Sequence, residues 1–134
     1  MRQGPVRALL DTSVFIAREQ GRWLGELPDE VAVSVVTISE LRHGVLAAED
    51  HATRARRLRT LETARRLGAP LLIDEAVGDE LARLRVALKA MGRALKVMDA
   101  WIAATAIVHD AAVCTQDADF DAAREAGLLE LVRV

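Results

Sequence analysis

The stretch "RALLDTSVFI", residues 7–16, ends an apolar run on an aspartate and continues with two hydroxyl side chains. Asp11 directly follows a strand predicted over Val6–Leu10. One interpretation is a helix cap, because Asp, Ser and Thr are favoured where a strand ends and a helix begins. The other is a ligand site, because ligands of open α/β sheets bind beyond the carboxyl ends of the strands. The stretch alone leaves both interpretations open.

The rest of the chain alternates short apolar runs with helical patterns. The runs predict strands over Val6–Leu10, Val31–Val36, Leu71–Ile73, Ala112–Cys114 and Leu128–Val132. Helices are predicted from Thr37, over residues 51–68, 74–92 and 96–108, and over the short segment 119–127. This alternation predicts an α/β fold, with a short parallel sheet of four to five strands flanked by helices on both faces. No linker or repeat interrupts it, so residues 1–134 are predicted to form a single domain.

Composition narrows the classes of function. With 51% hydrophobic residues and a net charge of −2, the chain suits one folded core, and nucleic-acid binding would need a local basic patch. The segment 51–66, with six arginines, is the one marked charge cluster. The single cysteine, Cys114, excludes an intrachain disulfide and fits a reducing cytoplasm. The apolar run before Asp11 is too short for a signal peptide or a membrane span, so we expect a cytoplasmic protein without membrane contact.

Asp99 is the most unusual carboxylate. It lies in "MDAWIAATA", where Ile102 and Ala103 follow at three and four positions and the next helical turn is apolar. Burying an unpaired charge costs several kcal/mol, whereas an exposed first-turn acid gains only about 0.3–1 kcal/mol from the helix N-terminus. A site role is therefore favoured over a purely local one.

Glu40 has two interpretations. The spacing Thr37-x-x-Glu40 is that of a capping box, in which the glutamate bonds back to the threonine amide. However, this helix follows the second predicted strand, at the same sheet edge as Asp11 if the sheet is parallel.

Three aspartates follow the fourth strand in "CTQDADFD". Asp117 is nearest the strand end and is the candidate site residue, while one or two of the three are predicted to cap the next helix. Asp74 directly precedes the helix that begins at Glu75 and is predicted to be a plain N-cap.

Asp11, Glu40, Asp99 and Asp117 are thus expected at one sheet edge. Four carboxylates within a few ångströms cannot all stay ionised without a cation. Oxygen ligands favour Mg²⁺ or Mn²⁺ over Zn²⁺, and the three histidines show no zinc-ligand spacing. A water on such an ion can act as the nucleophile in phosphodiester hydrolysis.

Four motifs, "LLDTSVFI", "SVVTISELRHG", "MDAWIAATA" and "CTQDADF", occur in this order from Leu9 to Phe120. Together they resemble PIN-domain ribonucleases, and more specifically the VapC toxins of bacterial toxin–antitoxin pairs. The resemblance implies a PIN-like fold, Mg²⁺- or Mn²⁺-dependent endoribonuclease activity, a homodimer and a cognate antitoxin. It implies catalytic and metal-binding roles for four acids, namely Asp11, Glu40, Asp99 and Asp117. It implies supporting roles for four neighbours, namely Thr12, Ser13, Thr115 and Asp119.

The substrate would be RNA. Candidate phosphate contacts are Arg54, Arg57, Arg93 and Lys96, with a solvated surface or an antitoxin contact as the alternatives for segment 54–66. Aromatic residues are scarce, so base stacking is not expected to dominate, and a structured RNA such as tRNA or rRNA, read by its shape and backbone, is expected.

Other α/β enzymes and modules fit less well. A phosphotransferase of the haloacid-dehalogenase type needs an aspartate two positions after the first, where this chain has Ser13. A response-regulator receiver needs an adjacent acidic pair before Asp11, which the sequence lacks. A PIN-like module that binds RNA or a partner without cleavage stays open, and binding without metal-dependent cleavage would identify it.

Overall fold

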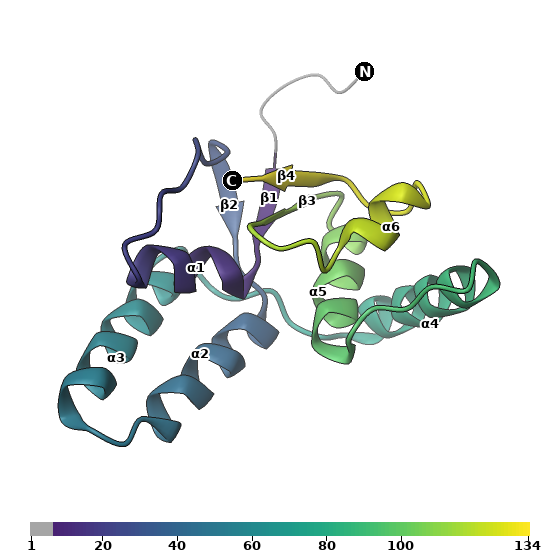
Figure 1. Ribbon diagram of the computed structural model, residues 1–134. Helices are drawn as coiled ribbons and strands as arrows, with labels where there is room; N and C mark the ends of the chain where they lie inside the picture. The colour runs from purple at the N-terminus through teal and green to yellow at the C-terminus, as the bar shows by residue number, and fades with distance from the viewer. Residues whose placement is uncertain (1–6) are drawn as a thin grey trace.

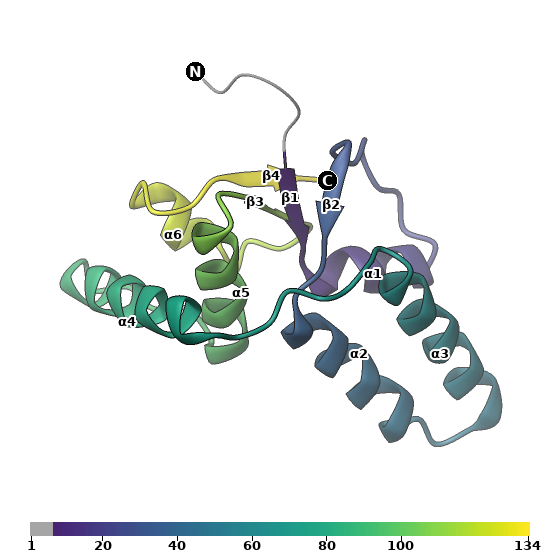
Figure 2. The same cartoon turned by 180° about the vertical axis from the view of Figure 1, so that it is seen from behind.

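The computed structural model describes residues 7–134 and shows one parallel β-sheet with helices on both faces (Figure 1 and Figure 2). Its strands are ordered β2-β1-β3-β4, and every neighbouring pair is parallel. They are β1 (Arg7–Leu10), β2 (Glu30–Ala32), β3 (Ala112–Thr115) and β4 (Leu131–Arg133). Val6, predicted as the first strand residue, lies outside the described residues. The two central strands β1 and β3 place the residues after them at the middle of one sheet edge.

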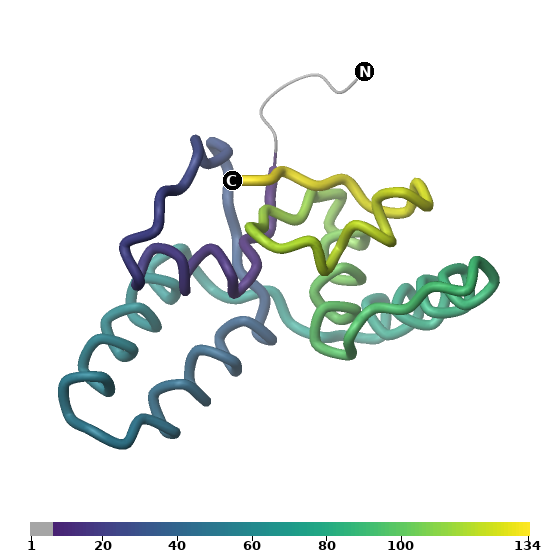
Figure 3. The backbone as a smooth tube through the Cα atoms, in the orientation of Figure 1, coloured from purple at the N-terminus to yellow at the C-terminus, as the bar shows by residue number. Residues whose placement is uncertain are grey.

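The six helices of the described residues pack on the two faces of the sheet. They are α1 (Thr12–Glu19), α2 (Val35–Ala47), α3 (His51–Arg65), α4 (Glu75–Ala90), α5 (Val97–Val108) and α6 (Asp121–Glu125). Helices α1, α2 and α3 lie on one face and α4, α5 and α6 on the other. The backbone tube in Figure 3 shows α2 and α3 as an antiparallel pair that extends away from the sheet, with α4 extending on the other side. Within residues 7–134, no helix is long and apolar enough to cross a membrane.

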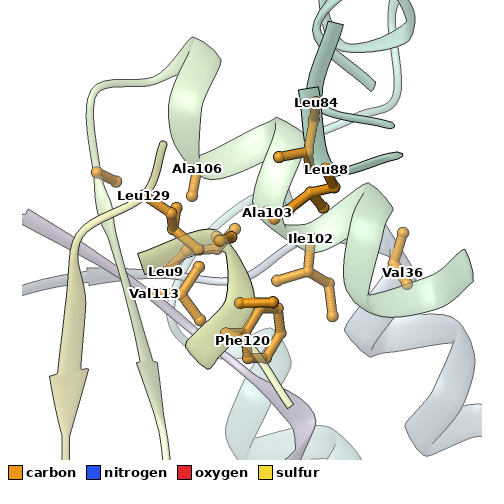
Figure 4. Packing of buried hydrophobic residues seen from close by; sticks show 13 residues of the cluster. Leu9, Val36, Leu84, Leu88, Ile102, Ala103, Ala106, Val113, Phe120 and Leu129 are labelled. Carbon is orange, nitrogen blue, oxygen red and sulfur yellow. The ribbon is translucent and has the colours of Figure 1, made fainter. Parts of the chain in front are cut away.

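Alternating residues of β1 feed two cores, because successive strand side chains point to opposite faces. Leu9 packs with α4, α5 and α6, and Phe120 and Ile102 lie at the centre of this cluster (Figure 4). Ala8 and Leu10 pack on the other face, against α1, α2 and α3. Burial on both faces explains why the central segments Ala8–Leu10 and Ala112–Cys114 are apolar.

Two strand predictions are wrong. The run Val31–Val36 divides, because β2 ends at Ala32 and α2 begins at Val35. The run Leu71–Ile73 contributes only an isolated bridge from Leu71 to Ser34, and Leu72 is 65% exposed. A short β-branched or apolar run fits either a strand or the start of a buried helix, so its pattern alone cannot decide. The sheet therefore has four strands, the lower end of the predicted range.

Candidate active site

Asp11 serves both roles that its sequence context allows. Its backbone is extended, and its side chain caps α1 by accepting a hydrogen bond from the Ser13 amide at 3.4 Å. The same carboxylate accepts a hydrogen bond from the Thr115 hydroxyl at 3.0 Å and is only 4% exposed. The cap and the site are one residue, since β1 ends where α1 begins.

The ends of the two central strands are joined by hydroxyl groups. The Thr115 hydroxyl accepts a hydrogen bond from the Asp117 amide at 3.0 Å and lies 3.1 Å from the Ser13 hydroxyl. Ser13 Oγ in turn accepts a hydrogen bond from the Gln116 amide at 3.0 Å. These bonds fix the loop after β3 against the start of α1, and with it the position of Asp117.

Removal of the Thr115 hydroxyl is expected to weaken this junction. Thr115→Val keeps the shape of the fully buried side chain but leaves the Asp117 amide without its acceptor and removes one of the two donors to Asp11 Oδ2. The expected loss in the free energy of unfolding is about 1–3 kcal/mol, measured by urea denaturation. Thr115→Ser, which retains the hydroxyl, serves as the control. A loss in Thr115→Ser with none in Thr115→Val would show that the methyl group, and not the hydroxyl network, matters here.

The capping-box interpretation of Glu40 is wrong. Helix α2 starts two residues earlier than predicted, and its N-cap is Ser34, whose hydroxyl accepts from the Val36 amide at 3.0 Å. Thr37 is therefore buried inside the helix and does not cap it. The Glu40 carboxylate instead accepts a hydrogen bond from the Thr12 hydroxyl at 2.7 Å, which orients it toward the start of α1.

Asp99 lies in the first turn of α5, which has no side-chain cap. Burial, together with the charges of Asp11, Asp119 and Glu40, raises the pKa of Asp99 to about 6, while Lys96 opposes them. The same effects act on Asp117, whose pKa is raised by burial and by Asp11 and Asp119, against the cations Arg22 and Lys96. A carboxyl group whose neighbours disfavour its charge is typical of a site that binds a cation.

The four predicted acids and Asp119 line one pocket of about 500 Å³. Its other walls are Thr12, Ser13, Ile16, Arg22, Lys96, Val97 and Met98. Thr115 lies behind it, bonded to Asp11. Asp74 caps α4 as expected, accepting from the Val77 amide at 3.0 Å. In contrast, the short helix α6 has no side-chain cap, so the prediction that an aspartate of residues 117–121 caps it is wrong.

Three of the four predicted phosphate contacts, all arginines, do not line the acidic pocket. Arg54 donates to the Ala48 carbonyl at 2.8 Å and Arg57 to the Gly44 carbonyl at 2.7 Å, so both tie α3 to the end of α2. Arg93 forms an ion pair with Glu125 at 3.0 Å. Lys96 alone lines the pocket.

Arg22 was missed by the sequence analysis. It lies in the loop after α1, and its place in the pocket depends on how that loop folds back. A single arginine outside any motif gives no local pattern from which this position can be predicted.

The donor set of the pocket fits a hard divalent cation. Its potential ligands are carboxylate and hydroxyl oxygens, with no cysteine or histidine among them. Across residues 7–134, no three acidic, histidine or cysteine side chains lie close enough together to enclose a metal ion by themselves. Mg²⁺ usually keeps several waters and uses only one or two carboxylates directly, so acids around such an ion also act through its waters.

The sequence and the fold both match known proteins. Residues 8–126 match the family described as "PIN domain". The chain is 47% identical over 132 residues to Ribonuclease VapC5 of Mycobacterium tuberculosis, covering 97% of each protein. It is 48% identical over 121 residues to Ribonuclease VapC4 of the same organism, covering 87% of this chain and 90% of that one.

Solved structures agree with these relatives. The crystal structure of VapBC-5, a toxin–antitoxin system from Mycobacterium tuberculosis, contains a chain that matches with a TM-score of 0.87 and 45% identity, covering 97% of this chain and 100% of that chain. The crystal structure of FitAcB from Neisseria gonorrhoeae matches with a TM-score of 0.73 and 30% identity, covering 92% and 95%. With a family match across most of its length and close relatives along nearly all of it, the chain belongs to the PIN-domain family and, within that family, to the VapC ribonucleases.

Proposed function

We propose that this protein is a divalent-metal-dependent endoribonuclease, the toxin of a toxin–antitoxin pair, and that it cleaves structured RNA such as tRNA or rRNA. The observation that carries the proposal is the gathering of five carboxylates in one pocket, where burial and then the charges of Asp11, Asp119 and Glu40 raise the pKa of Asp99. A divalent cation relieves the repulsion among these charges and supplies the chemistry that a phosphodiester requires.

Asp11, Glu40, Asp99 and Asp117 are the residues that would hold Mg²⁺ or Mn²⁺. The bound ion would supply an activated water and stabilise the charge that develops on the phosphate. The protein's own part is orientation. Thr115 and Ser13 hold Asp11, the Thr12 hydroxyl holds Glu40, and Lys96 places a positive charge beside the acids.

An antitoxin partner follows from the relatives. The matching VapBC-5 chain comes from a structure of a toxin–antitoxin system. We propose a cognate antitoxin for this chain on that basis, and a homodimer on the basis of the family resemblance. Purified protein used in activity tests must therefore be shown to be free of any co-expressed inhibitor.

The test is cleavage of purified tRNA and rRNA fragments by the inhibitor-free protein, with Mg²⁺, with Mn²⁺ and with EDTA. We expect discrete cuts that require the metal and disappear with EDTA, because the acids alone supply no activated water. Asp79→Asn, which removes an exposed acid on α4 away from the pocket, is the matched control and is expected to cut like the wild type. RNA binding without cleavage under every condition would instead support the non-catalytic binding module.

A further inference from the structure

The loop after α1 brings a cation to the acidic pocket and carries an exposed aromatic residue directly after it in the chain. Arg22 lines the pocket, and its charge lowers the pKa of Asp117. Trp23, the next residue, is 83% exposed, the highest value among the large hydrophobic side chains of residues 7–134. A single exposed tryptophan is common on protein surfaces, but this one follows a pocket-lining cation and has a free ring face on which a planar ligand can stack.

The structure ties this pair to the loop that carries Asp117. Gln116, the residue before Asp117, donates its side-chain amide to the Trp23 carbonyl at 3.1 Å and to the Val134 carbonyl at 3.3 Å. The Arg22 amide donates to the Ala17 carbonyl at 2.9 Å, which anchors the loop to the end of α1. The main chain of the pair is therefore held at both ends, next to one of the pocket acids.

The side chains of the pair have no partner that explains them. Among the described residues, Arg22 forms no ion pair within 4.0 Å, although it shares the pocket with five carboxylates. A nucleotide joins an anionic phosphate to a planar base, which are the two groups that guanidinium and indole bind best. The adjacent cation and ring match that pair of groups.

We propose that Arg22 and Trp23 form a subsite for the nucleotide next to the scissile phosphate, with the guanidinium on its phosphate and the indole stacked on its base. This inference rests on the proposed function, because it takes RNA as the occupant of the acidic pocket. The sequence alone led us to expect recognition by RNA shape and backbone. The subsite adds one base-stacking contact to that recognition. RNA is favoured over a protein partner because Arg22 lines the carboxylate pocket and Trp23 is the next residue in the chain.

Trp23 itself provides a readout. The chain has two tryptophans, and Trp101 is partly buried against the core, so Trp101→Phe leaves Trp23 as the single fluorophore. In an Asp99→Asn background, which is expected to bind without cutting, a 12-nucleotide mixed-sequence single-stranded RNA should quench Trp23 emission as it binds. Stacking on a base places the indole in direct contact with the quencher.

Affinity is measured in parallel with the same RNA, labelled with fluorescein, by anisotropy in the Asp99→Asn background. Trp23→Leu is expected to weaken binding roughly 10-fold, while Trp23→Phe retains most of it. Arg22→Ala should lower the slope of log affinity against log salt by about 0.7, the value for one phosphate contact on a single strand. Arg7→Ala, which removes an exposed arginine at the start of β1 and thus at the opposite sheet edge, should change neither quantity by a comparable amount.

The outcomes separate this inference from the proposed function. In the otherwise wild-type enzyme, Trp23→Leu should raise KM with little change in kcat, since the subsite binds the substrate and the transition state alike. Metal-dependent cleavage with unchanged KM and unchanged RNA affinity in Trp23→Leu would overturn the subsite and leave the nuclease intact. RNA binding that depends on Trp23 and Arg22 in a protein that cuts no RNA would support the subsite and refute the nuclease.

Discussion

Asp99→Asn is expected to reduce RNA cleavage at least about 100-fold and, at the same time, to stabilise the metal-free protein. The amide keeps the shape of the side chain but removes one charge from the acids that would hold the metal, and electrostatic groups of this kind carry large parts of the rate. The measurement is the single-turnover rate with Mg²⁺. Asp79→Asn, an exposed acid outside the pocket, is the control for a lost charge.

The gain in stability follows from the pKa. In the folded protein the pKa of Asp99 is about 6, above its ordinary value of 3.8. A raised carboxyl pKa contributes stability that is fully present below pH 3.8 and is lost as the pH rises through 6. Asp99 therefore opposes folding at neutral pH, and its removal should raise the free energy of unfolding by about 1–2 kcal/mol at pH 7.5, after allowance for solvent screening.

The pH profile tests the sign of this effect. Urea denaturation in EDTA should show the advantage of Asp99→Asn at pH 7.5 and little of it at pH 4.5, where the wild-type carboxyl group is largely protonated in the folded state. A variant that is less stable than the wild type at pH 7.5 would show that the carboxylate supports the fold, and the site assignment would weaken with it.

Phe120→Ala is expected to lower the free energy of unfolding by about 3–5 kcal/mol, a large share of the stability of a domain this size. Phe120 is fully buried and is the largest side chain of the core between the sheet and α5 (Figure 4). The ring also ends the loop that carries Asp117 and Asp119, so its loss affects both the core and the pocket.

Urea denaturation with a constant m-value measures the effect. Val86→Ala, which shortens a 71% exposed side chain on α4, should stay within about 0.5 kcal/mol of the wild type. Phe120→Leu should fall between the two, since it leaves a smaller cavity. A loss below 1 kcal/mol in Phe120→Ala would mean that the cluster repacks and does not depend on this ring.

The common pocket of the four acids could be predicted in part because two of them, Asp11 and Asp99, are out of place locally. Asp99 is followed by an apolar helical turn, and Asp11 ends a buried strand, so each residue conflicts with its own surroundings. A conflict between local pattern and residue type marks functional positions. The start of a helix directly after the second predicted strand then placed Glu40 at the same sheet edge, against the capping interpretation that spacing alone favoured.

The wrong strand and helix boundaries arose where the local sequence pattern fits a strand and a helix equally well. The segment "VSVVTIS" fits a strand and a buried helix equally, and only Ser34 as N-cap decides that α2 begins at Val35. Leu71 makes one bridge to Ser34 and no ladder, which depends on tertiary contacts. The place of Arg22 beside Asp117 depends on the path of a loop and on the Gln116 hydrogen bond to Trp23, neither of which a window of sequence encodes.

The pairing of β1 with β3 determines when the pocket can form during synthesis of the chain. The hydrogen bond from Thr115 to Asp11 joins residues 104 positions apart, and Asp117 follows directly after. A ribosome-bound chain that lacks β3 has Asp11 and Glu40 but cannot complete the pocket, because the central strand that brings Asp117 to it does not yet exist. The pocket therefore forms only after most of the chain, up to Asp117, has been translated.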